Sequence, residues 1–347
     1  MPANLAEIDG RVSIAYLGQT PWHGLGTKIT PEMARDVAAV RKAAGLDWQV
    51  SLAPMGYPSP AGWVTVKDTQ AVLRSSAAGP VYLSSVGPDY TVIQNEDAMR
   101  TLEDMVTRLG CQVATAGALG NGSECWALVQ MPDALIDVGG TGDTVKGYAF
   151  LRWGHTGNLS YLVDLTLIRV VCQNTYNAAL ADLLGKAGSV ARVMHRANAA
   201  ERLHDAEAVL SGLTEAAIKT GETFASLRNR IIGPADVARY IQTVFPSTET
   251  DAKTGAPIVS PILKARRQTI SQLVWLGKGA DLAGSTADGN TTPWAVWNAV
   301  TEYFDHVRPA EAKTDNARKA AQSSALFGGY NDVKARALVA ARQLVAA

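Results

Sequence analysis

The chain has 347 residues, 47% of them hydrophobic and 18% charged, which excludes an intrinsically disordered protein and suffices for two domains. Its 32 basic and 32 acidic side chains balance, so no overall field attracts nucleic acid or an anionic membrane, and a nucleic-acid surface would need a local patch. No apolar run is long enough to span a bilayer, and the N-terminus lacks a signal-peptide pattern. We therefore expect a soluble, cytoplasmic protein without membrane contact.

The first 175 residues are rich in strand patterns. Residues 11–18, 48–55, 62–76, 80–94, 111–131, 144–154 and 159–173 are expected to be extended. Asn121-Gly122 predicts a hairpin turn in the middle of 111–131, and "HTGN" (155–158) predicts a second hairpin turn. These patterns indicate a sheet built largely from antiparallel hairpins.

Two helices are expected among these strands. One is predicted over residues 30–45, with Thr30 as N-cap and Gly45 at its end. The other is predicted over 96–110, where Asn95 caps the amino end. Both fit helices that pack on a sheet.

Helical spacing and high alanine content dominate after residue 175. The expected helices are 176–185, 196–230, 234–245, 264–277, 292–307 and 330–346, with a loop or lid over 246–261. The sequence therefore predicts an α+β fold, in which a twisted antiparallel β-sheet with packed helices is followed by a helical C-terminal region. We expect a core domain over 1–185 and a helical region over 186–347.

Five spaced stretches resemble one family. They are "PWHGLG" (21–26), "VGPDYTVIQNEDA" (86–98), "IRVVCQNT" (168–175), "WNAVTEYFDH" (297–306) and "FGG" (327–329). Together they resemble the phage/plasmid-like proteins of domain of unknown function 932. The β-rich half is, more weakly, similar to single-strand annealing proteins of the Red-beta/RecT type. That similarity implies a non-enzymatic binder of single-stranded DNA that assembles into a ring or filament.

The predicted strand over 144–154 has the side chains that a single-strand platform needs. Alternation places Lys146, Tyr148, Phe150 and Arg152 on one face, where rings stack with bases and cations neutralise phosphates. The returning strand is expected to widen this surface with Tyr161 and Arg169 at matching parity. The alternative is that Tyr148 and Phe150 belong to the core.

The junction that follows this hairpin adds polar groups. Gln173, Asn174 and Thr175 could present amides, a hydroxyl and a helix N-terminus to phosphates or base edges, although Asn174 could simply cap the helix. Trp22 and His23 are expected to stack with bases at the edge of this surface. Arg192 and Arg196, from a basic stretch of the sequence, are expected to contact phosphates. A basic stretch can equally be a solvated face.

Catalytic and metal patterns are weak. Cys172 with His155 or His23 and with Asn174 would suit a cysteine-dependent hydrolase, but a cysteine near the end of an apolar strand usually packs as a small hydrophobe. The three cysteines show no CxxC spacing and the five histidines no HxxxH or HExxH pair, so we expect no metal and no cofactor.

Glu302 and His306 lie four residues apart, a spacing that could chelate. We prefer a hydrogen-bonded pair that holds helix to helix.

The sequence thus predicts non-catalytic binding of single-stranded nucleic acid, with strand annealing left open, in recombination or replication of a mobile element. The expected partners are single-stranded DNA, with RNA left open, and further copies of the chain. The alternatives are the hydrolase and a structural or interaction protein of a phage.

Overall fold

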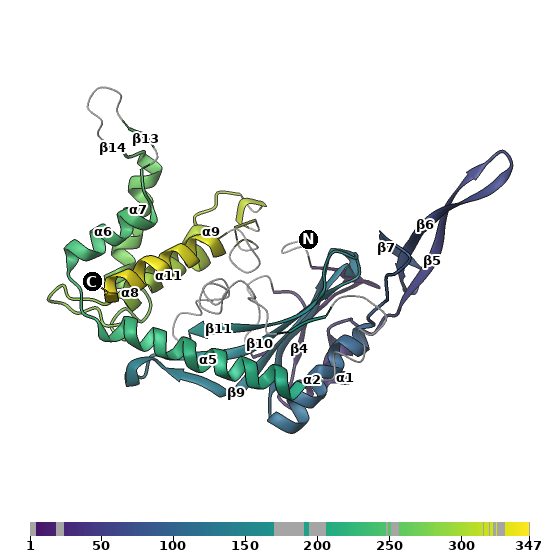
Figure 1. Ribbon diagram of the computed structural model, residues 1–347, viewed down its shortest axis with the longest axis horizontal. Coiled ribbons are helices and arrows are strands. Elements are labelled where there is room, and N and C mark those ends of the chain that lie inside the picture. Colours follow the sequence, from purple (N-terminus) through teal and green to yellow (C-terminus); the bar gives the residue numbers. More distant parts are fainter. Residues whose placement is uncertain are drawn as a thin grey trace. The chain divides into compact units, whose positions relative to one another are not determined.

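The chain folds as an α+β protein (Figure 1), which confirms the class expected from the sequence. The computed structural model describes residues 5–18, 24–169, 191–193, 206–247, 249–250, 257–314, 316–318, 320–321, 324 and 330–346. Contacts divide the chain into two compact units. The first takes Met1–Asp133, Tyr148–Leu165 and Ser189–Glu215, and the second takes Ala134–Gly147, Thr166–Gly188 and Ala216–Ala347. The boundary expected between residues 185 and 186 lies outside the described residues and stays a prediction.

A seven-stranded sheet has the order β12-β11-β10-β9-β8-β3-β4. Its strands, in chain order, are β3 (Ile14–Leu17), β4 (Thr27–Ile29), β8 (Gln112–Leu119), β9 (Glu124–Asp137), β10 (Thr144–Gly154), β11 (Tyr161–Arg169) and β12 (Ala191–Val193). β3 pairs antiparallel with β8 and parallel with β4. The turn between β8 and β9 contains Asn121 at a φ of 54°, as the Asn-Gly pair predicts.

Helices α1 (Val37–Ala43) and α2 (Asn95–Leu109) pack together, and α1 contacts β3 and β8. The helix expected over 30–45 is shorter than predicted. Residues Met33–Arg35 form a 3₁₀ turn, and α1 begins only after Asp36, whose carboxylate accepts a hydrogen bond from the Ala39 N–H at 3.0 Å. Asp36 is extended, and an extended N-cap marks where an α-helix starts.

A second sheet has three strands in the order β5-β6-β7: β5 (Val50–Ser59), β6 (Gly62–Arg74) and β7 (Val81–Val86). β5 and β6 form a long two-stranded ribbon that continues beyond β7 (Figure 1). The extended stretch expected over 80–94 ends at Val86, because the residues after it form a loop before α2. A short pair, β1 (Glu7–Ile8) and β2 (Arg11–Val12), precedes β3.

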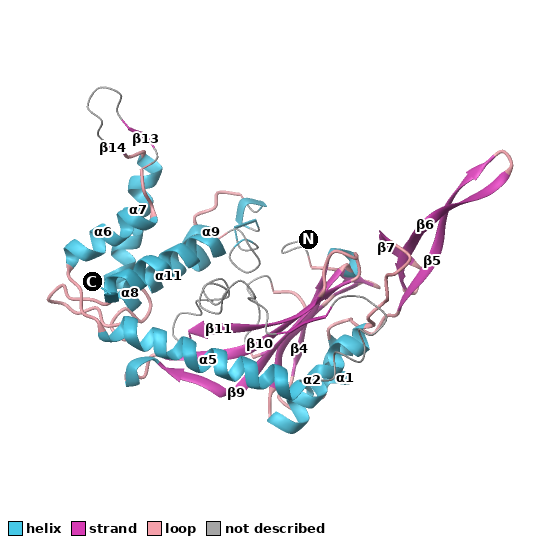
Figure 2. Cartoon of the chain, viewed as in Figure 1, coloured by secondary structure: helices cyan, strands magenta, loops and turns pink. Residues whose placement is uncertain are grey.

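The described residues after 205 are mainly helical (Figure 2), as expected. The helices are α5 (Ala206–Asn229), α6 (Pro234–Val244), α7 (Pro261–Leu276), α8 (Pro293–Glu302), α9 (Arg308–Ala310) and α11 (Asn331–Ala346). A π-helical turn, η5 (Tyr303–Val307), joins α8 to α9. The stretch expected as a loop over 246–261 contains a strand pair, β13 (Glu249–Thr250) with β14 (Pro257–Ile258). None of the helices in the described part of the chain has the length and hydropathy to span a bilayer.

The core of the second unit is built around aromatic rings. The Phe224 ring lies 4.7 Å from that of Trp294 and 5.4 Å from that of Trp297. The Trp294 indole N–H donates to Asp143 at 2.8 Å, so its polar edge is satisfied where it is buried. Rings of this size supply much of the apolar burial that stabilises the unit.

The predicted Glu302–His306 hydrogen bond is not formed among the described residues. The Glu302 carboxylate instead accepts from the backbone N–H of Lys278 at 3.1 and 3.2 Å, which ties α8 to the segment after α7. The Nε2 atom of His306 is buried without a hydrogen-bond partner. The prediction failed because the Glu302 carboxylate is hydrogen-bonded to the backbone N–H of Lys278 instead of to His306.

Candidate functional site

Strand β10 alternates as its sequence predicts. Val145, Ala149, Leu151 and Trp153 are buried, whereas the intervening side chains of Lys146, Tyr148, Phe150 and Arg152 are each half-buried. The two sets point to opposite faces of the strand because successive side chains alternate. The cations and rings singled out from the sequence therefore share one face of β10, and that face retains access to solvent.

The two rings on this face have different surroundings. Phe150 packs against a small hydrophobic cluster that contains Ile14 and Trp126. Tyr148 is half-buried, and burial raises the pKa of its phenol above the ordinary value. Phe150 thus belongs to the edge of the core, which was the alternative interpretation, while Tyr148 keeps an exposed part that could stack with a base.

Arg152, a cation on this face, has a hydrogen-bond donor without an acceptor. Its Nε atom is buried and has no hydrogen-bond partner. An arginine N–H that is buried without an acceptor costs free energy, so such groups are rare unless a ligand or water satisfies them. A phosphate oxygen is a strong acceptor for a guanidinium.

The expectation that Tyr161 widens the same surface is wrong. Tyr161 is only 2% exposed, and its hydroxyl interacts with Thr101 of α2. It therefore lies on the helix-covered face of the sheet. The register pairs Leu162 with Arg192 of β12, so position 192 is in the sheet beside β11.

The remaining predicted contacts cannot be placed. The backbones of Arg169 and Arg192 lie in β11 and β12, but their side chains are outside the described part of the structure. The following residues also lie outside it and stay predictions: Trp22, His23, Cys172, Gln173, Asn174, Thr175 and Arg196.

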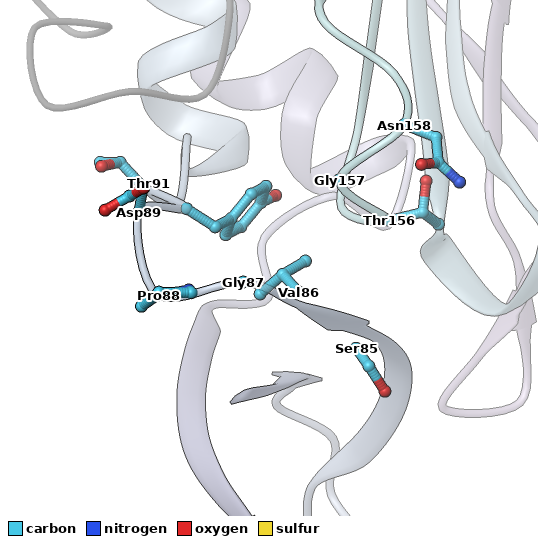
Figure 3. Close-up of a pocket in the computed structure, with 10 residues that line it drawn as sticks. Ser85, Val86, Gly87, Pro88, Asp89, Thr91, Thr156, Gly157 and Asn158 are labelled. Carbon is cyan, nitrogen blue, oxygen red and sulfur yellow. The ribbon is translucent and has the colours of Figure 1, made fainter. Parts of the chain in front are cut away.

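A pocket of about 850 Å³ lies beyond the end of β10. Two segments line it: the loop after β7, residues 85–91, and the turn between β10 and β11, residues 156–158. Figure 3 shows Asp89 and Thr91 on one side, Thr156 and Asn158 on the other, and Val86 between them. A volume of this size is typical of small-molecule sites.

The turn side of the pocket is positioned by a buried polar network. The Asn95 side chain, 1% exposed, accepts a hydrogen bond from the Trp153 indole at 2.9 Å and contacts Nε2 of His155 at 3.1 Å. Asn95 also donates to the Leu46 carbonyl at 3.2 Å. The expectation that Asn95 is the N-cap of α2 is wrong: Gln94 holds that position, and Asn95 is the first helical residue.

The loop side is held at both of its ends. At one end, Val86 pairs with Gln70 of β6, and the Ser84 hydroxyl donates to the His155 carbonyl at 2.8 Å. At the other end, the Gln94 amide bonds both the N–H and the carbonyl of Val50, at 2.9 and 2.8 Å. Fixed ends give the loop a defined course, so the pocket is largely preformed.

Gly157 allows the two sides to meet. Its φ of +77° is in the left-handed region, and a Cβ added there would lie 3.1 Å from Cγ1 of Val86. Glycine is therefore needed both for the turn and for the close approach.

The pocket lining suits an uncharged polar group. It combines the hydroxyls of Ser85, Thr91 and Thr156 with the Asn158 amide and the Asp89 carboxylate, and Tyr90 adds an aromatic ring. Burial raises the pKa of Tyr90 to about 12, so its phenol stays neutral. No lysine or arginine is among the lining residues, so a sugar or base fits this chemistry better than a phosphate. The sequence predicted an extended segment over 80–94 and a turn over 155–158, and neither prediction indicated a site.

The described cysteines show no sign of activation. Cys111 and Cys125 are buried, and burial together with the nearby Glu124 charge raises the pKa of Cys125. A raised pKa disfavours the reactive thiolate. The described residues also contain no group of three or more His, Cys, Asp or Glu side chains that could hold a metal ion.

A family model described as domain of unknown function, DUF932, matches residues 82–326, more than half of the chain. The chain belongs to the DUF932 family. The DUF932 match includes β10, β11 and the whole pocket lining, whereas the ribbon of β5 and β6 precedes it. No curated protein and no solved structure matches the chain. The resemblance to DUF932 is thus confirmed, and the similarity to annealing proteins of the Red-beta/RecT type has no support from these comparisons.

Proposed function

We propose that the protein binds single-stranded nucleic acid without catalysis, in the bacterial cytoplasm, during recombination or replication of a phage or plasmid. The surface that we assign to this role is the half-buried face of β10, with Tyr148 as the stacking ring and Arg152 as the phosphate contact. Arg192 of β12 is separated from β10 by strand β11. Further copies of the chain are expected partners.

The observation that carries the proposal is the unpaired guanidinium Nε of Arg152 on the same strand face as the exposed part of Tyr148, four residues away along β10 with Phe150 between them. Base stacking on an aromatic ring contributes about 1–3 kcal/mol, and a neighbouring cation supplies the backbone contact. Both side chains are held by a strand, so little ordering is needed on binding.

The pocket complements this face. Thr156 follows Arg152 by four residues, which limits the Cα separation to roughly 13 Å, about two nucleotides of an extended strand. A strand whose phosphate contacts Arg152 could place an uncharged base or sugar in the pocket. The absence of cations among the lining residues is consistent with that division of roles.

Replacing Arg152 with Ala is expected to weaken binding of a fluorescent single-stranded DNA oligonucleotide about tenfold, roughly 1.4 kcal/mol, because a charge-assisted hydrogen bond is lost. The slope of log affinity against log salt should fall by about 0.7, the value for one phosphate contact to a single strand. Titrations at low and moderate salt measure both quantities, and RNA of the same sequence decides between the two nucleic acids.

Arg100→Ala is the matched control, since Arg100 is exposed on α2 and pairs with Asp97 at 3.0 Å. It should leave affinity and salt slope unchanged. Thermal unfolding of each variant checks that the fold is intact. The proposal is wrong if the wild-type chain does not bind at micromolar concentration, if salt has no effect, or if Arg152→Ala behaves like Arg100→Ala.

A further inference from the structure

The ribbon of β5 and β6 exposes an unusual amount of apolar surface. Trp63 is 63% exposed, Tyr57 54%, Val66 41% and Val64 38%. Alternation and register place Tyr57, Val64 and Val66 on one face of the ribbon and Trp63 on the other, and exposed apolar surface of this kind marks an interaction site. The Trp63 indole lies over Gly56, where an added Cβ would come within 2.5 Å of its Nε1 atom, so the ring is held against the ribbon.

The outer part of the ribbon offers no cation to a phosphate-bearing partner. Residues 48–66 contain no charged side chain and no histidine, and the flanking charged residues are Asp47 and Lys67. Binding of nucleic acid draws on cations that neutralise phosphates, and the outer ribbon has none. An uncharged surface can, however, meet a copy of itself without like-charge repulsion.

The two edges of the ribbon differ in their ability to pair. Pro58 of β5 is opposite Trp63 of β6, and a proline cannot donate a ladder hydrogen bond. The Pro58–Trp63 pair is therefore a non-hydrogen-bonded pair, and alternation makes Gly56–Thr65 another. The N–H and C=O groups of Trp63 and Thr65 thus point away from β5, toward the free edge of β6, while Pro58 blocks the edge of β5.

The free edge has a defined length. β7 pairs with β6 only from Gln70 onward, and before that point β6 passes through an irregularity in its register with β5, where Asp68 has a φ of 58°. Gly62–Val66 is therefore an exposed edge without a strand partner in the described part of the chain, and Val64 is its centre. Exposed edges with β-branched and aromatic residues readily accept another strand.

We propose that this edge pairs with the same edge of a second copy, antiparallel and centred on Val64. Trp63 then lies opposite Thr65 of the second copy, and the relation is reciprocal, as a two-fold interface requires. The two Val64 residues lie directly opposite each other. This inference does not depend on nucleic-acid binding, and it identifies a surface for the expected self-association.

A cysteine at position 64 tests the geometry. In a non-hydrogen-bonded antiparallel pair the Cα atoms are about 4.5 Å apart, within the range that a disulfide bridges. Val66 of one copy lies opposite Gly62 of the other, so the two Val66 residues are four residues apart along the strand. That separation is roughly 13 Å, too far for a disulfide. In a Cys172→Ser background, Val64→Cys should form a covalent dimer under mild oxidation on a non-reducing gel, and Val66→Cys should not. Equal cross-linking of the two variants, or none, would overturn the pairing.

Opposite charges at position 64 provide a second readout. Sedimentation velocity over a concentration series should show dimer formation by the wild-type chain and loss of it in Val64→Glu and in Val64→Lys, because like charges then face each other. An equimolar mixture of the two variants should restore the dimer. Leu276→Glu, at an 83% exposed residue of α7, is the control and should dimerise as the wild type does. The proposal is contradicted if the wild-type chain stays monomeric at all concentrations, or if the mixture of the two variants does not form the dimer. Neither result affects the Arg152 test of nucleic-acid binding.

Discussion

Replacing Lys334 with Met is expected to lower the free energy of unfolding by about 3–5 kcal/mol, the largest effect that we predict for a single substitution. Lys334 of α11 forms an ion pair with Asp305 of η5, and the two side chains are only 1% and 6% exposed. Methionine fills a similar volume but leaves the Asp305 carboxylate buried without its cation. Urea or thermal unfolding of the full chain measures the loss.

The double variant Lys334→Met, Asp305→Leu separates the cost of the unpaired charge from the cost of altered packing. Exchanging a buried ion pair for apolar side chains of similar volume is often neutral, so the double variant should recover most of the loss. The Lys334 carbonyl, which accepts from the Trp297 indole at 3.1 Å, is present in both variants. A double variant as unstable as Lys334→Met would show that packing, rather than the ion pair, accounts for the effect.

The hairpins and the faces of β10 could be predicted because their causes are local. Asn121-Gly122 supplies the backbone angles of its own turn, and the alternation of small or apolar residues with Lys146, Tyr148 and Arg152 follows from the two-residue period of a strand. The α+β class follows from these patterns together with the helical spacing after residue 175. Nothing beyond neighbouring residues is needed for such inferences.

The roles of Asn95 and Tyr161 could not be predicted in this way. Local preference makes Asn95 a cap, but its partners Trp153 and His155 are 58 and 60 residues away in the chain. Counting alternate residues along the chain suggested that Tyr161 faces the same side of the sheet as Tyr148. Which face a residue of β11 occupies depends, however, on the register of the β10–β11 hairpin, and the turn between the strands sets that register. The pocket was missed for the same reason, since it exists only where residues 85–91 meet residues 156–158.

The ribbon of β5 and β6 shows a different limit. Its strands were expected from the sequence, but their exposure was not, because an apolar β-branched stretch such as "GWVTV" is typical of a buried strand. Only the register with β7, which stops at Gln70, reveals that this part of β6 has no strand on its second edge among the residues that the structure describes. Whether an apolar strand is exposed depends on contacts with distant parts of the chain, so the sequence pattern alone does not reveal it. Apolar surface that stays exposed after folding indicates an interaction site.

Replacing Asn95 with Ala is expected to destabilise the protein by about 2–4 kcal/mol, because a buried indole N–H loses its acceptor and a buried carbonyl loses its donor. Asn95 bonds Trp153 at 2.9 Å and Leu46 at 3.2 Å in a site that is 1% exposed. Chemical denaturation measures the change. Since His155 also contacts Asn95 and begins the turn that lines the pocket, hydrogen exchange of residues 156–158 should accelerate in the variant.

A double-mutant cycle with Trp153→Phe isolates the central hydrogen bond. Phenylalanine removes the indole N–H, so Asn95→Ala should cost about 1 kcal/mol less in that background than in the wild type. Gln94→Ala is the neighbouring control: it removes two bonds to the Val50 backbone at the other end of the pocket loop and should accelerate exchange in residues 87–91 rather than in the turn. Two outcomes would contradict this role of the network. Asn95→Ala could cost the same free energy in the wild-type and Trp153→Phe backgrounds, or Asn95→Ala and Gln94→Ala could accelerate exchange in the same segment.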